Sequence, residues 1–154
     1  MNAQAIEVRD DRGRLTGRFH LQDGRLHGPA TLYTDGRVLA EIGYVLGLRH
    51  GEMRSYGEFG QLSSVVAHAD DVPHGEAQYF HPDGALARSA VYQQGRLHGE
   101  VRDYSPDGKL VSATQYVEGK PQTAAGAASG TVVAPAASAT RDGRKSWLSR
   151  LVEG

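Results

Sequence analysis

Between residues 11 and 120, apolar and polar positions alternate over short runs that are separated by glycine-bearing turns. The clearest run is residues 100–104 (Glu-Val-Arg-Asp-Tyr), which a Ser-Pro-Asp-Gly turn at 105–108 joins to a return run over 110–116. A spacing of two between like residues is the period of a β-strand, and no helical apolar period occurs here. Proline sets the first central position of a turn, and glycine accepts a positive φ. The pattern therefore predicts a β-meander of short antiparallel strands.

The return runs also predict two unequal faces, because successive side chains of a strand point in opposite directions. One set of positions is mostly apolar or aromatic: Leu15/Phe19/Leu21, Val38/Ile42/Tyr44, Leu62/Val66/His68, Leu86/Ala90/Tyr92 and Leu110/Thr114/Tyr116. The other set is smaller or polar: Leu39/Glu41, Ser63/Val65, Ala87/Ser89 and Val111/Ala113. The sheet is expected to have one apolar, aromatic face and one face of smaller or polar side chains.

The runs repeat with a period of 24 residues, which decides the fold. His-Gly pairs stand at His27-Gly28, His50-Gly51, His74-Gly75 and His98-Gly99, with steps of 23, 24 and 24. Three further columns are the glycines Gly36, Gly60, Gly84 and Gly108, the rings Tyr44, His68, Tyr92 and Tyr116, and the aromatic residues Tyr33, Tyr56, Phe80 and Tyr104. The fold class predicted is all-β, a single-layer antiparallel meander of tandem 24-residue β-hairpin repeats, stabilised by contacts between neighbouring units.

These columns resemble a known repeat. The spacing Gly-x-x-His-Gly-x4-aromatic-x3-Gly-x-Leu, followed by an aromatic residue and a glycine, is similar to the MORN repeat over residues ~11–120. It looks closest to the bacterial MORN-variant group, whose members are often antitoxins or immunity proteins encoded beside secreted toxins. Three departures stand out: the first full unit is one residue short, His68 replaces a ring, and Glu58-Phe59-Gly60 replaces the Asp-Gly turn.

Composition divides the chain into three parts. Residues 1–120 form the repeat domain, and residues 121–140 are rich in Ala, Gly, Ser and Thr, which is typical of a flexible linker. Residues 141–154 are expected to hold a short C-terminal helix capped by Ser146 or Asp142. It would place Trp147, Leu148 and Leu151 on one side, but so short a helix is unstable alone. This cluster is expected to dock on the repeats, where it would cap an edge strand near Lys109–Tyr116, or to bind a partner.

Charge and cysteine content narrow the functional classes. The chain has 17 basic and 18 acidic residues, so bulk charge gives no case for nucleic-acid binding. Residues 1–120 carry a balance of −3, which disfavours anionic membranes. Without cysteine there are no disulfides or thiolate metal sites. No leader pattern or apolar span occurs, so a cytoplasmic location is expected.

No catalytic, cofactor or metal site is predicted. The four histidines of the His-Gly column repeat about 9.5 Å apart along one edge, too far for a shared ion, and are expected to pack or hydrogen-bond beside glycine. Every Ser, His and Asp candidate for a triad obeys the repeat, and an open ribbon offers no closed pocket. The chain is therefore expected not to be an enzyme.

The predicted binding residues lie on the strands that follow the His-Gly pairs. These strands carry an aromatic column beside charged side chains, the mixture that protein interfaces use. The candidates are Tyr33, Tyr56, Phe80, Tyr104, Glu52, Arg54, Glu100 and Arg102, together with Trp147, Leu148 and Leu151 of the tail. Whether the aromatic column binds or packs stays open, whereas the return-strand rings Tyr44, Tyr92 and Tyr116 are expected to pack.

Two functional classes remain. The resemblance implies a non-catalytic immunity or antitoxin protein, whose partner would be a cognate toxin or effector. The alternative is a structural or membrane-surface adaptor, because the MORN family takes its name from proposed membrane contact. The oligomeric state is not predicted.

Overall fold

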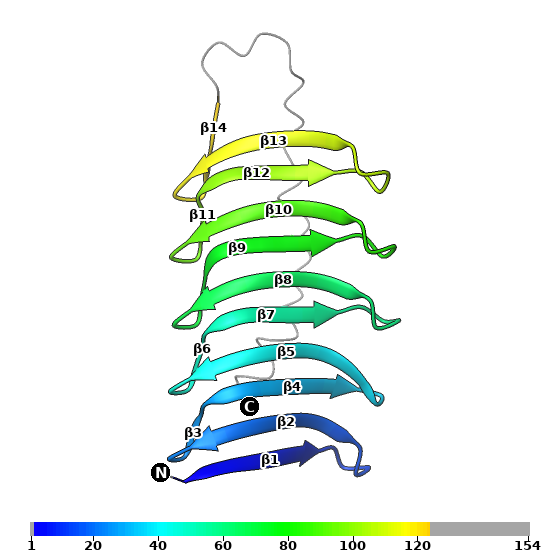
Figure 1. Ribbon diagram of the computed structural model, residues 1–154, viewed down its shortest axis with the longest axis vertical. Coiled ribbons are helices and arrows are strands. Elements are labelled where there is room, and N and C mark those ends of the chain that lie inside the picture. The colour runs from blue at the N-terminus through cyan, green and yellow to red at the C-terminus, as the bar shows by residue number, and fades with distance from the viewer. Residues whose placement is uncertain (1, 124–154) are drawn as a thin grey trace. The chain divides into compact units, whose positions relative to one another are not determined.

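The computed structural model describes residues 2–123, and within them the chain forms one antiparallel sheet with no helix (Figure 1). The long strands are β1 (Ala3–Arg9), β2 (Leu15–Gln22), β4 (Gly28–Thr34), β5 (Arg37–Val45), β7 (Gly51–Tyr56), β8 (Leu62–Ala69), β9 (Val72–Phe80), β10 (Leu86–Gln93), β12 (Gly99–Tyr104) and β13 (Leu110–Val117). The short strands are β3 (Arg25–Leu26), β6 (Leu48–Arg49), β11 (Arg96–Leu97) and β14 (Lys120–Gln122). The single-layer all-β meander is confirmed.

The strands lie side by side in chain order, from β1 to β14. The short strands β3, β6 and β11 pair with the ends of β2, β5 and β10, which also pair with the next long strand. The meander begins earlier than the repeat columns indicate. Residues 3–9 form a complete strand in register with β2, although they carry no His-Gly pair and no column glycine.

Two kinds of turn join the strands. Asp35 and Gly36 have φ values of 47° and 77°, the paired positive φ of a two-residue type I′ turn. The other hairpin turns at this end of the strands span five residues, as in residues 57–61, where Gly57 and Gln61 are hydrogen-bonded through their backbones at 2.8 Å. The first full unit is therefore one residue short because its turn at Asp35 and Gly36 is shorter than the five-residue turns. Glu58 and Phe59 do not change the local hairpin.

The two faces differ in burial as the alternation predicts. In β7, β9 and β12 a buried residue stands between two exposed ones, as Val101 does between Glu100 and Arg102. The buried side chains of this face include Ala30, Leu32, Ala40, Ile42, Met53, His68, Ala77, Ala90, Val101, Thr114 and Tyr116. We call this side of the sheet the buried face and the other side the open face. Alanine recurs among these buried residues, at Ala30, Ala40, Ala77 and Ala90.

The leucines that begin the return strands do not lie on the face that alternation predicts. Alternation assigned Leu62, Leu86 and Leu110 to the same face as the buried rings of their strands. The register shifts by one residue just after each of them, and Leu62 stands opposite Tyr56 while Leu110 stands opposite Tyr104. A β-bulge adds an extra residue to one strand, so a count of two cannot be carried across it.

The linker and the C-terminal segment predicted at residues 121–154 lie outside the described residues, apart from residues 121–123. One part of that prediction is nevertheless corrected. The edge at Lys109–Tyr116 is not wholly open, because β14 pairs with β13 at Gln115, Tyr116 and Val117. Within residues 2–123 no helix is long and apolar enough to cross a membrane.

Candidate protein-binding face

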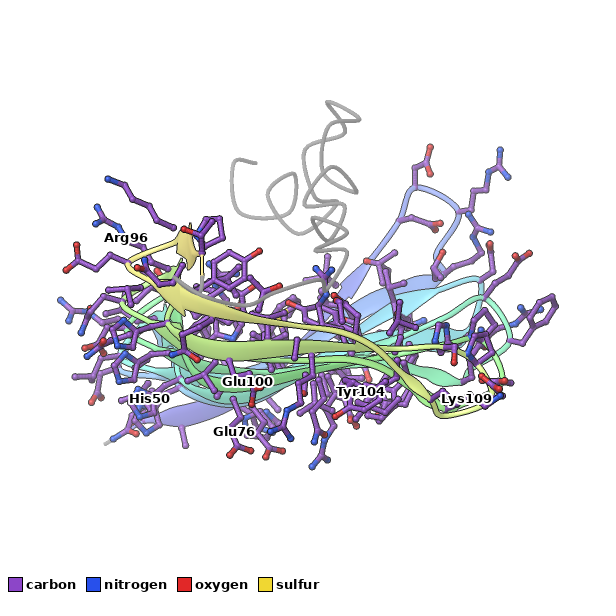
Figure 2. All side chains as sticks on the ribbon, turned by 90° about the horizontal axis from the view of Figure 1, so that it is seen from above. His50, Glu76, Arg96, Glu100, Tyr104 and Lys109 are labelled. Carbon is purple, nitrogen blue, oxygen red and sulfur yellow. The ribbon has the colours of Figure 1, made fainter. Side chains whose placement is uncertain are left out.

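Long polar side chains form parallel ridges on the open face. Figure 2 shows Glu76, Glu100 and Tyr104 on the same side of the sheet. The ridges follow β7, β9 and β12, and each carries a glutamate, a middle polar residue and an aromatic ring: Glu52/Arg54/Tyr56, Glu76/Gln78/Phe80 and Glu100/Arg102/Tyr104. Because alternate strands bear them, neighbouring ridges lie roughly 9.5 Å apart. The strands between carry smaller residues such as Ala67 and Ser89, so the open face is corrugated.

Ion pairs organise two of the three ridges. Arg54 binds Glu52 at 2.9 Å, and Arg102 binds Glu100 at 2.6 Å. The four side chains are between 43 and 59 % exposed, so the pairs are accessible to a partner and contribute little to folding. Glu100 and, secondarily, Tyr104 raise the pKa of Arg102. The middle ridge has Gln78 in place of arginine, which leaves Glu76 as its single charge.

The aromatic column lies on the open face, half-buried, at the end of each ridge. Tyr56 donates a hydrogen bond of 2.6 Å to Glu41 on the preceding return strand, and this bond, with burial, raises the pKa of Tyr56. In the first repeat, the guanidinium of Arg18 lies 5.8 Å from the centre of the Tyr33 ring. The predicted residues Tyr33, Tyr56, Phe80, Tyr104, Glu52, Arg54, Glu100 and Arg102 are thus brought together on one surface.

The sequence interpretation did not include Arg18 and Glu41 in this surface. They occupy the same repeat position, since Arg18 pairs with Thr31 and Glu41 pairs with Arg54 in equivalent ladders. The later repeats have Val65, Ser89 and Ala113 at that position. A charged residue in a column of small ones was the signal that could have identified them.

Two open hollows lie beside the ridges. One, of about 340 Å³, lies over Gly43 and is bordered by Thr31, Glu41, Glu52 and Arg54. The other, of about 490 Å³, lies beside the Tyr56 ring and the Thr34–Val38 turn region. Both are open to solvent and provide no water-excluded environment of the kind that catalytic sites use.

Two histidines of the His-Gly column accept a backbone hydrogen bond from within their own repeat. His27 accepts a hydrogen bond from the backbone N–H of Leu46 at 3.4 Å, and His74 accepts one from Gln94 at 3.2 Å. Each ring thereby contacts the turn of its own unit, as expected for residues that bond beside glycine. Among residues 2–123 no three His, Asp or Glu side chains are grouped so that they could hold a metal ion.

The return-strand rings pack on the buried face. Tyr116 and His68 are buried, and the hydroxyls of Tyr79 and Tyr92 lie 3.4 Å apart. Burial raises the pKa of Tyr44 and, with the neighbouring Tyr92, that of Tyr79. The expectation that these rings pack is supported by their burial, which leaves the open face as the surface with accessible polar and aromatic groups.

Comparison with known proteins identifies the repeat. Residues 73–94 and 97–118, which span β9–β10 and β11–β13, match the model of the MORN repeat variant. No curated protein matches the chain. MORN repeats in general bind proteins or membrane lipids and are not catalytic. The chain therefore contains two units that match MORN repeat variants, within a longer array of the same hairpin architecture.

Proposed function

We propose that this chain is a non-catalytic binding protein that holds a protein partner against its open face. One observation carries the proposal: glutamate, a middle polar residue and an aromatic ring recur at equivalent, accessible positions on β7, β9 and β12. Aromatic and arginine side chains supply most hot spots in protein interfaces. Their half-burial in the free chain fixes the rings in place, which lowers the entropy lost on binding.

The finer proposal is that the chain is an immunity or antitoxin protein that neutralises a cognate toxin in the cytoplasm. Its support is the similarity to MORN repeat variants together with a surface that suits a macromolecule better than a small substrate. A sheet of this kind can inhibit by covering a toxin's active domain, which requires no chemistry of its own. A protein partner is also favoured by charge, because Glu76 has no arginine on its ridge and residues 1–120 carry a balance of −3, which an anionic membrane would repel.

We propose Trp147, Leu148 and Leu151 as a second contact with the same partner. These residues lie outside the described part of the chain, and the proposal rests on their sequence alone. The protein has one tryptophan, so its emission reports directly on this segment. A blue shift on adding the partner supports the proposal, and emission that is unchanged by a partner that binds the chain contradicts it.

The experiment uses the protein encoded next to this gene. If that neighbour arrests growth when expressed alone, co-expression of the full chain should restore growth, and the two proteins should copurify. Changing Tyr56, Phe80 and Tyr104 together to alanine should weaken binding by several kcal/mol if they are hot spots. The matched control changes Leu46 and Phe59 to alanine, two turn residues that are 62 and 85 % exposed.

Circular dichroism and thermal unfolding decide between binding and folding. A triple variant that stays folded but no longer binds supports the proposal, and one that binds as before excludes this part of the open face. If the variant unfolds, the single changes Glu52→Ala and Arg102→Ala, at exposed positions, provide the same test. A neighbour that neither arrests growth nor copurifies contradicts the immunity role.

A further inference from the structure

The last return strand has an incomplete set of partners. Three internal return strands, β2, β5 and β10, pair with a short strand near their end and then with the next long strand, and the fourth, β8, pairs with the continuous strand β9. The ladder from β10 to β12 consists of two pairs, Arg88 with Asp103 and Ser89 with Arg102. The strand β13 pairs with β14 but, within residues 2–123, with no long strand beyond it. The equivalent positions of β13 are Ser112 and Ala113.

The direction of the backbone groups follows from the internal junctions. The N–H of His50 donates to the carbonyl of Gly43, and that of His98 donates to Val91 at 2.9 Å. Alternate residues of a strand direct their polar groups to the same side. Ser89, like Val91, therefore points its N–H and C=O toward β12, and Ala113 points its own toward the open edge of β13. The same strand carries two exposed apolar side chains, Leu110 (56 % exposed) and Val111 (63 % exposed).

The first strand has the complementary edge. Within residues 2–123, β1 pairs only with β2. Its register with β2 repeats that of β12 with β13. Glu7 pairs with Arg18 as Arg102 pairs with Ala113, and in both ladders the register shifts after the next pair toward the turn. Residues 4–9 therefore correspond to β12 (Gly99–Tyr104). By this correspondence, Ala5 and Glu7 direct their backbone polar groups away from β2.

We propose that copies of this chain associate head to tail, with β13 of one copy pairing with β1 of the next. The pairs would be Ser112 with Val8 and Ala113 with Glu7, the same two-pair junction that joins β10 to β12. Asn2 of the incoming copy would approach Pro121, so the terminal residues shift aside. This association is independent of the proposed function, because it uses the edges and leaves the open face free.

The turns offer a further backbone contact for this arrangement. Arg14 reaches forward to Asp35 of the next hairpin turn at 2.6 Å, and Arg37 reaches the backbone carbonyl of Glu58 at 2.5 Å. Lys109 holds the same position in the last turn, where no further hairpin follows within residues 2–123, and it binds only Asp107 of its own turn. Asp11 holds the position of Glu58 in the first turn and is exposed, and Arg12 holds the position of Asp35. Lys109 of one copy would therefore lie near the backbone carbonyl of Asp11 of the next, as Arg37 lies near that of Glu58.

A symmetric dimer through β13 is disfavoured by β14. That short strand already covers β13 at Gln115, Tyr116 and Val117, which leaves residues 110–114 as the open edge in each copy. Antiparallel pairing about a twofold axis there would bring the turn at residues 105–109 of each copy against β14 of the other. In the heterologous contact the overlap with β14 is confined to Asn2 and Ala3 of the incoming copy, and the outer edges stay free to extend the chain of copies.

The test blocks each edge separately in the full chain. Ala113→Pro removes the outward N–H of β13 at the junction, and Glu7→Pro removes that of β1, while Ala113→Val and Glu7→Gln keep the N–H as controls. Proline is tolerated at such an edge because the lost N–H faces away from the sheet. Sedimentation velocity over a concentration series gives the mass relative to the 16.5 kDa chain.

We expect the parent protein and both controls to gain mass with concentration beyond a dimer. Each proline variant alone should stay at the mass of one chain, and an equal mixture of the two should form a dimer and no larger species. A parent protein that stays monomeric overturns the proposal and points to an edge covered by the chain itself. Dimers of Glu7→Pro alone would also overturn it, because they indicate a symmetric contact through β13.

If circular dichroism shows that a proline variant is unfolded, Val111→Lys and Val8→Lys replace the pair. Both positions are exposed, at 63 and 45 %, and a lysine on an edge strand opposes pairing without removing a backbone group. The expected results are unchanged. A mixture of these two variants that remains monomeric while the parent protein associates would contradict the head-to-tail arrangement.

Discussion

The hydroxyl of Tyr56 lies 2.6 Å from the carboxylate of Glu41, so that a ring on one repeat is bonded to the return strand of the repeat before it. The bond raises the pKa of Tyr56 and links the two units on the open face. It makes one ring of the proposed binding surface part of the coupling between repeats.

Replacing Tyr56 by Phe should remove this bond and lower the free energy of unfolding by about 1 kcal/mol near neutral pH. Because the pKa of Tyr56 is raised in the folded state, its stabilisation is fully present below the ordinary tyrosine value near 10 and is lost as the pH rises through the folded value. Urea unfolding at pH 7 and above pH 10 measures both effects. Tyr33→Phe is the control, since the Tyr33 ring contacts Arg18 through its face. Equal losses of unfolding free energy in Tyr56→Phe and Tyr33→Phe would contradict the assignment of this stability to the bond between Tyr56 and Glu41.

His68 should make the sheet sensitive to acid. Burial lowers its pKa below the ordinary value, so its contribution to stability is present above the ordinary value near 6.5 and is lost as the pH falls through the folded value. The three equivalent positions of the other repeats hold tyrosine. His68→Tyr should therefore reduce the fall in melting temperature between pH 7 and pH 5. His50→Gln, at a half-exposed histidine, is the control. An unchanged pH profile in His68→Tyr would show that other groups dominate.

Val101 is the largest side chain that is completely buried, at 2 % exposure, and packs near Ala77 and Ala90. Shortening it to alanine should cost about 2 kcal/mol, from lost burial and the cavity left behind. The same change at Val111, which is 63 % exposed, should cost less than about 0.5 kcal/mol. Chemical denaturation of both variants provides the measurement. Similar losses would mean that the buried face contributes little to the stability of the array.

The sequence was sufficient to predict the hairpin repeat, its turns and the two faces. Column glycines such as Gly36 and Gly60 have positive φ, which other residues adopt only at a cost, so their spacing marks the turns directly. Alternation correctly separated Val101 from its exposed neighbours Glu100 and Arg102. These features depend on local backbone conformation and on side-chain size, both of which the sequence of each unit determines.

Features that depend on neighbouring units were not predictable in the same way. The bulge that places Leu62 opposite Tyr56 is a property of the pairing and not of one strand's pattern. The bond between Tyr56 and Glu41 joins different repeats, so no column contains it. Strand β1 was not predicted because it ends the array and no His-Gly pair precedes it, although its turn to β2 holds Gly13 at positive φ. Terminal units of repeat proteins are commonly atypical in this way.

The two-pair ladder between β10 and β12 has a mechanical consequence. The strands run across the long axis of the sheet, so a force applied along that axis acts on the interstrand hydrogen bonds in sequence and not together (Figure 1). Each junction then resists alone, those after β2, β5 and β10 with two pairs to the next long strand and the one after β8 with a longer ladder, and neighbouring junctions cannot share the load. Under tension the sheet is expected to open as a zipper, at low force and one hairpin at a time.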